Sequence, residues 1–133
     1  MDMSACIEAC LTSHRLCAET ATHVLHGGKG DHSETEHLTA LLDCAQITMA
    51  GVDFMARRSP HHAHICAECA EICEACAELC EAHPDSDGQM RRCAEACRRS
   101  AQTCREMGRA RRRDPDRGGR RHRTGVPRPS RAA

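Results

Sequence analysis

The spacing of the cysteines between residues 62 and 83 predicts one long α-helix. The gaps alternate between three and four residues, an arrangement that keeps side chains on one face of a helix. Five cysteines follow it: Cys66, Cys69, Cys73, Cys76 and Cys80. Ala and Glu, which favour helices, fill most positions between them, and the glutamates fall away from the cysteine face. An apolar stripe beside that face consists of Ile65, Ile72 and Leu79. We therefore expect a helix with a cysteine face, an aliphatic flank and an acidic outer side.

The same spacing predicts a helix at the start of the chain. Ser4 is expected to cap it, and it should reach about His26, before a group of glycines that begins at Gly27. Its three-and-four face carries Met3, Cys6, Cys10, His14 and Cys17.

A second helix is predicted over roughly residues 34–58, and its apolar residues are mostly the usual large hydrophobic ones. Ser33 and Glu36 have the spacing of a capping box at its start. Its bulk comes from leucine, isoleucine, valine, phenylalanine and methionine, and Cys44 is its single cysteine. Ser59 and Pro60 then fit the cap and first position of the cysteine-rich helix, which should end near His83.

A fourth helix is predicted from a possible capping box at Ser86 and Gln89 to about residue 112. It contains no leucine, isoleucine, valine or aromatic residue, so only Ala, Met and Cys can pack it against its neighbours. Its inward face should carry Met90, Cys93, Cys97, Ala101 and Cys104, with Met107 one step further.

Four helices of similar length joined by short turns predict an all-α fold, an antiparallel four-helix bundle with a cysteine-lined core. The bundle should occupy residues 1–113. Residues 114–133 are rich in Arg, Gly and Pro and predict a disordered tail. The tail has no aromatic residue to stack on bases, which argues against a nucleic-acid partner.

Twelve cysteines in 133 residues require an explanation. A secreted disulfide scaffold fits poorly, because the start MDMSACIEAC lacks the basic and apolar regions of a signal peptide. Cysteines three or four apart on one helix are also badly placed to bridge each other. We expect no run long and apolar enough to cross a membrane. We therefore expect a reducing cytoplasm, where cysteine arrays favour metal binding or redox chemistry.

Many thiolates with a few Met and His side chains suit soft or borderline ions such as Cu(I), Zn(II) or an iron–sulfur cluster. Zinc usually takes four ligands from turns, and these cysteines lie on continuous helices. The iron–sulfur pattern is also absent, because Cys80 is followed by Glu81 where ferredoxins have proline. Cu(I) fits best, since it accepts two or three sulfurs and a sulfur can bridge two ions. Multiple Cu(I) ions are expected, on the order of ten per chain.

Two alternatives to copper storage remain open. A zinc-binding scaffold would saturate near three ions, at about four sulfurs per ion. A thiol redox protein would use a Cys-x-x-Cys pair, such as Cys66–Cys69 or Cys73–Cys76, but these pairs lie in mid-helix.

The chain resembles the bacterial copper storage proteins, and the lack of a signal peptide resembles their cytosolic branch. The resemblance covers about residues 3–108. It is carried by the pairs Cys6–Cys10 and Cys93–Cys97 and by the run from Cys66 to Cys80. It implies Cu(I) storage in the core, a homotetramer, no catalysis, and entry of copper at one bundle end that carries His and Met. Cys44 alone on the second helix and the Arg-rich tail depart from the family pattern.

Both ends of the predicted bundle carry additional candidate ligands. One end should gather His26, His37, His83 and Met90, and the other Met3, Met55, His62 and Met107. We expect copper to enter at the first end, because its imidazoles form an exchange site open to water. His14 could be either a ligand or a buried hydrogen-bonded side chain. The expected ligands are Cys6, Cys10, Cys17, Cys44, Cys66, Cys69, Cys73, Cys76, Cys80, Cys93, Cys97, Cys104, His37, His83 and Met90.

Overall fold

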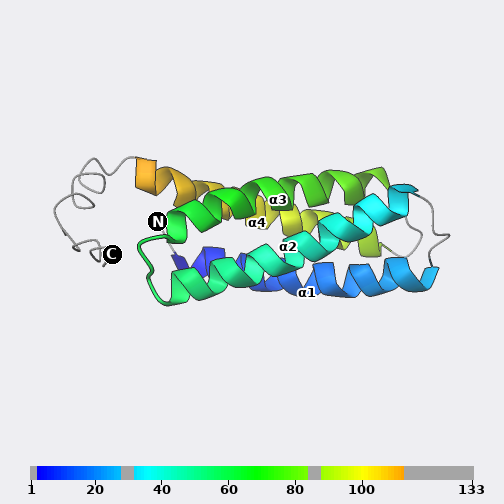
Figure 1. Ribbon diagram of the computed structural model, residues 1–133, viewed down its shortest axis with the longest axis horizontal. Coiled ribbons are helices and arrows are strands. Elements are labelled where there is room, and N and C mark those ends of the chain that lie inside the picture. The colour runs from blue at the N-terminus through cyan, green and yellow to red at the C-terminus, as the bar shows by residue number, and fades with distance from the viewer. Residues whose placement is uncertain (1–2, 28–31, 84–87, 113–133) are drawn as a thin grey trace, which may run out of the picture.

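The computed structural model describes residues 3–27, 32–83 and 88–112, and these segments form four helices. The helices are α1 Met3–Gly27, α2 His32–Ala56, α3 His62–Ala82 and α4 Gln89–Arg112. Each helix packs against the next one along the chain, and α4 closes the ring by packing against α1. Figure 1 shows the resulting elongated bundle of antiparallel neighbours. The predicted all-α four-helix bundle is confirmed. The predicted tail, residues 114–133, lies outside the described residues.

The predicted serine caps of the first two helices are wrong. Ser4 and Ser33 lie inside the first turns of α1 and α2, because Met3 and His32 are already helical. Ser86, proposed as the cap of α4, lies outside the described residues. Helix positions were therefore predicted well from the spacing of apolar and cysteine residues, whereas the starting residues were not.

The turn between α2 and α3 uses two local capping arrangements. The Ser59 amide donates to the Phe54 carbonyl at 2.9 Å and the Arg58 amide to the Met55 carbonyl at 3.0 Å, which together form a Schellman motif. Arg58 accordingly adopts a left-handed conformation with φ of 53°. The Ser59 hydroxyl then accepts the His61 amide at 3.1 Å. The predicted helix cap at Ser59 is therefore wrong, because α3 begins at His62 with His61 at the cap position. The Ser59 hydroxyl instead stabilises the turn that precedes the helix.

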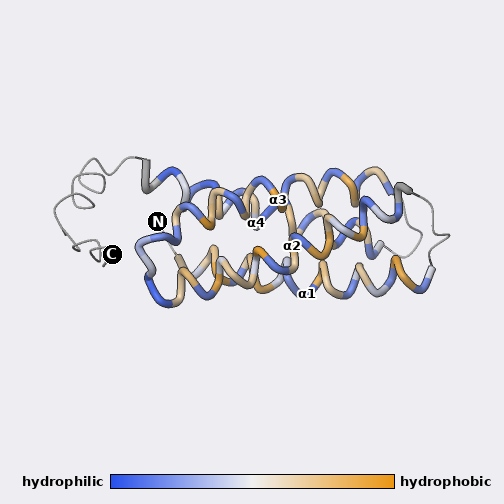
Figure 2. The backbone as a smooth tube through the Cα atoms, in the orientation of Figure 1, coloured by the Kyte–Doolittle hydropathy of each residue, from blue (hydrophilic) through white to orange (hydrophobic). Residues whose placement is uncertain are grey.

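The core contains small and sulfur-bearing side chains in place of the usual large aliphatic ones. Leu41 and Met55 are the largest fully buried side chains, and the rest of the core is mainly Cys and Ala. Figure 2 shows hydrophobic and hydrophilic residues alternating along each helix, as expected for helices with one buried face. Such small side chains let the four backbones approach closely.

The outer faces of α3 and α4 are joined by opposite charges. Arg98 on α4 lies 2.6 Å from a Glu81 carboxylate oxygen and 3.8 Å from Glu74, and Arg105 lies 2.5 Å from Glu74. Beneath these pairs, Gly108 passes so close to Ala67 that an added Cβ would lie 3.3 Å from the alanine methyl. The predicted acidic outer side of α3 therefore pairs with the basic side of α4.

One segment of α2, Glu34–Ala56, is long and apolar enough to cross a membrane by length and composition. The sequence expectation that no run reaches this threshold misses it. Leu41, Cys44 and Met55 of this segment are fully buried against the other helices. About a third of the apolar window is buried inside the bundle, and Leu42 within it is exposed. The core helix of a bundle can meet the same criterion, so length and composition alone are weak evidence for a membrane span.

Candidate metal centre

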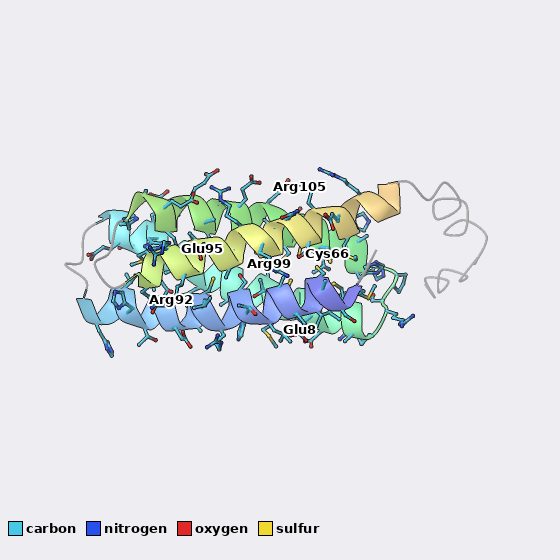
Figure 3. All side chains as sticks on the ribbon, turned by 180° about the vertical axis from the view of Figure 1, so that it is seen from behind. Glu8, Cys66, Arg92, Glu95, Arg99 and Arg105 are labelled. Atoms are coloured by element: carbon cyan, nitrogen blue, oxygen red, sulfur yellow. The ribbon has the colours of Figure 1, made fainter. Side chains whose placement is uncertain are left out.

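All twelve cysteine side chains point into the bundle, and none is more than 2% exposed. All of them are free thiols. Figure 3 shows Cys66 between the helices, whereas charged side chains such as Glu8 and Arg99 lie on the outside. The predicted cysteine-lined core is therefore confirmed. We call these twelve side chains, which follow the bundle axis, the thiol seam.

The seam begins, near the start of α1, with a group of three sulfurs from α1 and α4. The Sγ atoms of Cys6 and Cys10 lie 3.6 Å and 3.4 Å from that of Cys104. All three atoms lie within 4.8 Å of one another. Cys66 on α3 also interacts with Cys6 and Cys104. Three mutually close sulfurs match the coordination preference of Cu(I).

Further along, one cysteine from each helix contributes to a group of four: Cys17, Cys44, Cys76 and Cys97. Two of its contacts join helices at opposite corners of the bundle, Cys17 to Cys76 at 4.0 Å and Cys44 to Cys97 at 3.8 Å. The centre of the bundle is therefore only as wide as one sulfur–sulfur contact. An ion held there could take ligands from all four helices.

A third group, Cys76, Cys80 and Cys93, follows toward the end of α3. Cys76 belongs to both the second and the third group, so the two groups share a sulfur. Shared sulfurs are what a string of bridged ions requires.

Two serines occupy the middle of the seam, and sequence reasoning missed both. Ser13 and Ser100 are fully buried. The predicted seam residue His14 is instead only half-buried, and its Nδ1 donates to the Ala45 carbonyl at 2.7 Å. A gap of three residues from Cys10 reaches Ser13 as easily as a gap of four reaches His14. The seam position goes to the serine, whose hydroxyl lies against the Cys97 and Cys44 sulfurs.

The end of the bundle that carries His37, His83 and Met90, which we call the histidine end, opens into a pocket of about 190 Å³. Its lining is His23, Val24, Gly27, Glu34, His37, His83 and Met90. His26, which was expected here, is exposed and does not line the pocket. His23 lines it instead, although the sequence indicated no role for it.

Two histidine rings connect this pocket to the seam. His37 and His83 are stacked with ring centroids 4.6 Å apart, and His37 Nε2 lies 3.1 Å from the Cys80 sulfur. His83 Nδ1 donates to the Leu79 carbonyl at 2.7 Å. That bond places the proton on Nδ1 and leaves the Nε2 lone pair of His83 available to a metal.

The opposite end, which we call the methionine end, carries Met3, Met55, His62 and Met107. Met55 and Met107 are buried there, and Met3 is half-buried. His62 Nδ1 donates to the Ser59 carbonyl at 2.8 Å. The thioethers fill the core at this end, so they act at least as packing groups.

Hydrogen bonds between the thiols lower the pKa of some cysteines and raise the pKa of others. Hydrogen bonds from Cys10 and Cys6 stabilise the thiolate of Cys104 and lower its pKa to about 5. Bonds from Cys44 and Cys69 lower the pKa of Cys73 to about 4, and burial opposes both shifts. The pKa of Cys6 is raised through its bonds to Cys10 and Cys104 and by burial. Neighbouring thiols therefore favour the thiolate form at Cys73 and Cys104, and thiolates are the form that binds metal.

The chain matches the family model described as copper storage protein over residues 1–109. No curated protein matches it. A crystal structure of a protein from Nitrosospira multiformis is similar, with 38% identity, 81% of this chain and 95% of that chain covered, and a TM-score of 0.73. The Cu(I)-bound copper storage protein BsCsp3 is 35% identical, with 79% and 96% covered and a TM-score of 0.73. Apo copper storage protein 3 from Bacillus subtilis is 34% identical, with 80% and 99% covered and a TM-score of 0.70. With twelve inward cysteines and a match over most of its length, the chain belongs to the copper storage protein family.

Proposed function

We propose that this protein stores Cu(I) in the cytoplasm and binds the ions through the thiolates of its twelve cysteines. The observation that carries the proposal is the thiol seam itself, in which all twelve sulfurs are buried and many of them touch a neighbour at 3.4–4.0 Å. The Cu(I)-bound state of BsCsp3, 35% identical to this chain, supports the choice of metal. Each incoming ion displaces protons from the thiols that it joins.

Coordination number favours Cu(I) over zinc. Two of the three sulfur groups contain three sulfurs, a number that Cu(I) accepts without a further ligand, whereas a tetrahedral zinc ion would need a fourth. The group of Cys17, Cys44, Cys76 and Cys97 has the four sulfurs that zinc prefers, so zinc binding at that one place is the second candidate. A thiol redox role would need an exposed thiol of low pKa, and every cysteine here is buried.

Copper enters, in this proposal, at the histidine end. His83 and Met90 line the pocket that opens to solvent there, and His37 touches both the His83 ring and the Cys80 sulfur. An ion can therefore pass from imidazole to thiolate by exchanging one ligand at a time. No group in this pathway performs a chemical reaction on the ion, and the protein has no catalytic role.

In this proposal the protein assembles into a homotetramer. Leu25 on α1 and Leu42 on α2 are 63% and 54% exposed, and contact between copies would cover such side chains. The protein that delivers or removes copper is a separate partner, and it would meet the pocket at the histidine end.

An anaerobic titration of the reduced protein with Cu(I), read with a chromophoric Cu(I) chelator as competitor, tests the function. We expect tight uptake on the order of ten ions per chain. A parallel titration with Zn(II) is the control, and it should saturate at far fewer ions. Uptake of only about one to three Cu(I) ions, with zinc bound more tightly, would contradict storage.

A further inference from the structure

Two buried hydroxyl groups interrupt the thiol seam near its middle. The Ser13 Oγ lies 3.5 Å from the Cys97 sulfur and 3.8 Å from that of Cys44. The Ser100 Oγ lies 3.5 Å from both the Cys10 and the Cys73 sulfurs. Both serines have 0% exposure, so each hydroxyl is a built part of the core.

The serines share one layer of the bundle with two cysteines. Ser13 on α1 and Ser100 on α4 lie at the level of Cys44 on α2 and Cys73 on α3. Cys44 and Cys73 touch at 3.4 Å and are the only sulfurs of this layer. We call these four residues the hydroxyl layer.

The layer separates two sets of five sulfurs. On the methionine side lie Cys6, Cys10, Cys66, Cys69 and Cys104. On the histidine side lie Cys17, Cys76, Cys80, Cys93 and Cys97. The sulfur contacts described for these cysteines cross the layer from Cys69 to Cys73 at 3.7 Å and from Cys73 to Cys44 at 3.4 Å. On the histidine side, Cys44 then meets Cys97 at 3.8 Å and belongs to the same sulfur group as Cys17 and Cys76.

The hydroxyl layer offers Cu(I) fewer ligands than the rest of the thiol seam. A serine hydroxyl is a hard and neutral oxygen, whereas Cu(I) selects soft thiolates, so the serines leave half of this layer without a copper ligand. Their O–H groups can instead donate to thiolates that they touch, as charge-assisted hydrogen bonds. Ions on the two sides are therefore linked only through Cys44 and Cys73.

We propose that Ser13 and Ser100 divide the copper store into two pools that exchange with the outside at different rates. The inference rests on the storage function proposed above and specifies how the store is organised. The pool on the histidine side exchanges directly through the pocket. The pool on the methionine side exchanges only after its ions pass the hydroxyl layer, so it fills last and empties last.

Removal of copper from the fully loaded protein by an excess of a Cu(I) chelator tests this division. We expect two kinetic phases of about equal amplitude, since each side holds the same number of sulfurs. The double variant Ser13→Cys/Ser100→Cys supplies soft ligands of similar size. It should bind about two more ions and release all of its copper in a single phase.

The matched control is Ser13→Ala/Ser100→Ala, which removes the hydroxyls without adding sulfur. It should keep the wild-type stoichiometry and both phases. If the cysteine double variant does not fold, Ser100→Cys alone should add about one ion and increase the rate of the slow phase.

Two results would overturn the division: release of wild-type copper in one phase, or a cysteine variant with unchanged stoichiometry and phases. Uptake of only about one to three Cu(I) ions by the wild type would instead contradict the storage function itself. The two failures are therefore distinguishable.

Discussion

His37 shows how burial can tune a single side chain at the entrance of the seam. Burial, and then the nearby charge of His83, hold the pKa of His37 below its ordinary value of 6.5. A neutral imidazole is the form that can bind a metal. Near neutral pH the ring is therefore ready to pass an ion between the pocket and Cys80.

The same shift predicts a pH dependence of stability. The unfolded chain protonates this imidazole near pH 6.5, whereas folded His37 resists protonation until a lower pH. The free energy of unfolding of the copper-free protein should therefore fall as the pH falls below about 6.5. Urea denaturation at several pH values measures this. His37→Asn should flatten the dependence, and His26→Asn, at an exposed position, should not.

His83 and His62 provide a comparison between the two bundle ends. Each donates its Nδ1 proton to a backbone carbonyl, but only His83 lines the pocket. His83→Ala should slow transfer of Cu(I) from a chelator complex by about tenfold and leave the final stoichiometry unchanged. His62→Ala should change neither quantity. Stopped-flow absorbance of the chelator gives both the rate of transfer and the final stoichiometry. Equal slowing by the two variants would contradict entry at the histidine end.

At the scale of the helices, two glycines differ in how closely a neighbour approaches. A Cβ on Gly108 would lie 3.3 Å from the Ala67 methyl and 3.5 Å from its Cα, because α3 and α4 touch there. A Cβ on Gly51 would meet only the flexible end of Met55, at 4.0 Å. The first glycine is required by packing and the second is not.

Alanine substitutions at these positions should therefore have opposite effects. Gly51→Ala should raise the free energy of unfolding by about 0.5–1 kcal/mol, the usual gain for alanine over glycine in a helix. Gly108→Ala should lower it by about 1 kcal/mol or more, because the helices must move apart. Chemical denaturation of the copper-free variants checks both values. Stabilisation by both substitutions would show that α3 and α4 can separate at little cost.

The helices and their inward faces could be predicted because the cysteines themselves mark the faces. Which of two adjacent residues faces the core could not always be predicted, because a helix with 3.6 residues per turn allows a gap of either three or four residues between inward positions. That ambiguity explains why His14 was expected where Ser13 lies, and His26 where His23 lines the pocket. The hydrogen bond from His14 to Ala45 depends on a neighbouring helix and has no signal in the local sequence.

At the scale of the whole molecule, the empty protein has few large side chains to stabilise it. Among the described residues Leu41 is the single fully buried leucine, and α4 contains no leucine, isoleucine or valine. Bound ions would therefore contribute much of the stability of the loaded form.

We expect saturating Cu(I) under anaerobic conditions to raise the unfolding temperature by more than about 15 °C. A ligand at roughly 1,000 times its Kd adds about 4 kcal/mol per site, and each 1 kcal/mol moves Tm by about 4 °C in a domain of this size. Differential scanning calorimetry with and without Cu(I) measures the shift. An unchanged Tm at saturation would place the ions outside the core.

The short sulfur contacts also limit how long the protein can remain empty. Cys10 and Cys104 lie 3.4 Å apart, and a modest movement would bring them to the roughly 2.0 Å of a disulfide. Each such bond consumes two ligands, so oxidative damage would lower storage capacity in steps of two sulfurs. Burial slows the damage and bound copper blocks it, because a sulfur that holds an ion cannot pair. The vulnerable molecule is therefore the vacant one, and a cell that keeps this store in reserve must also keep it reduced.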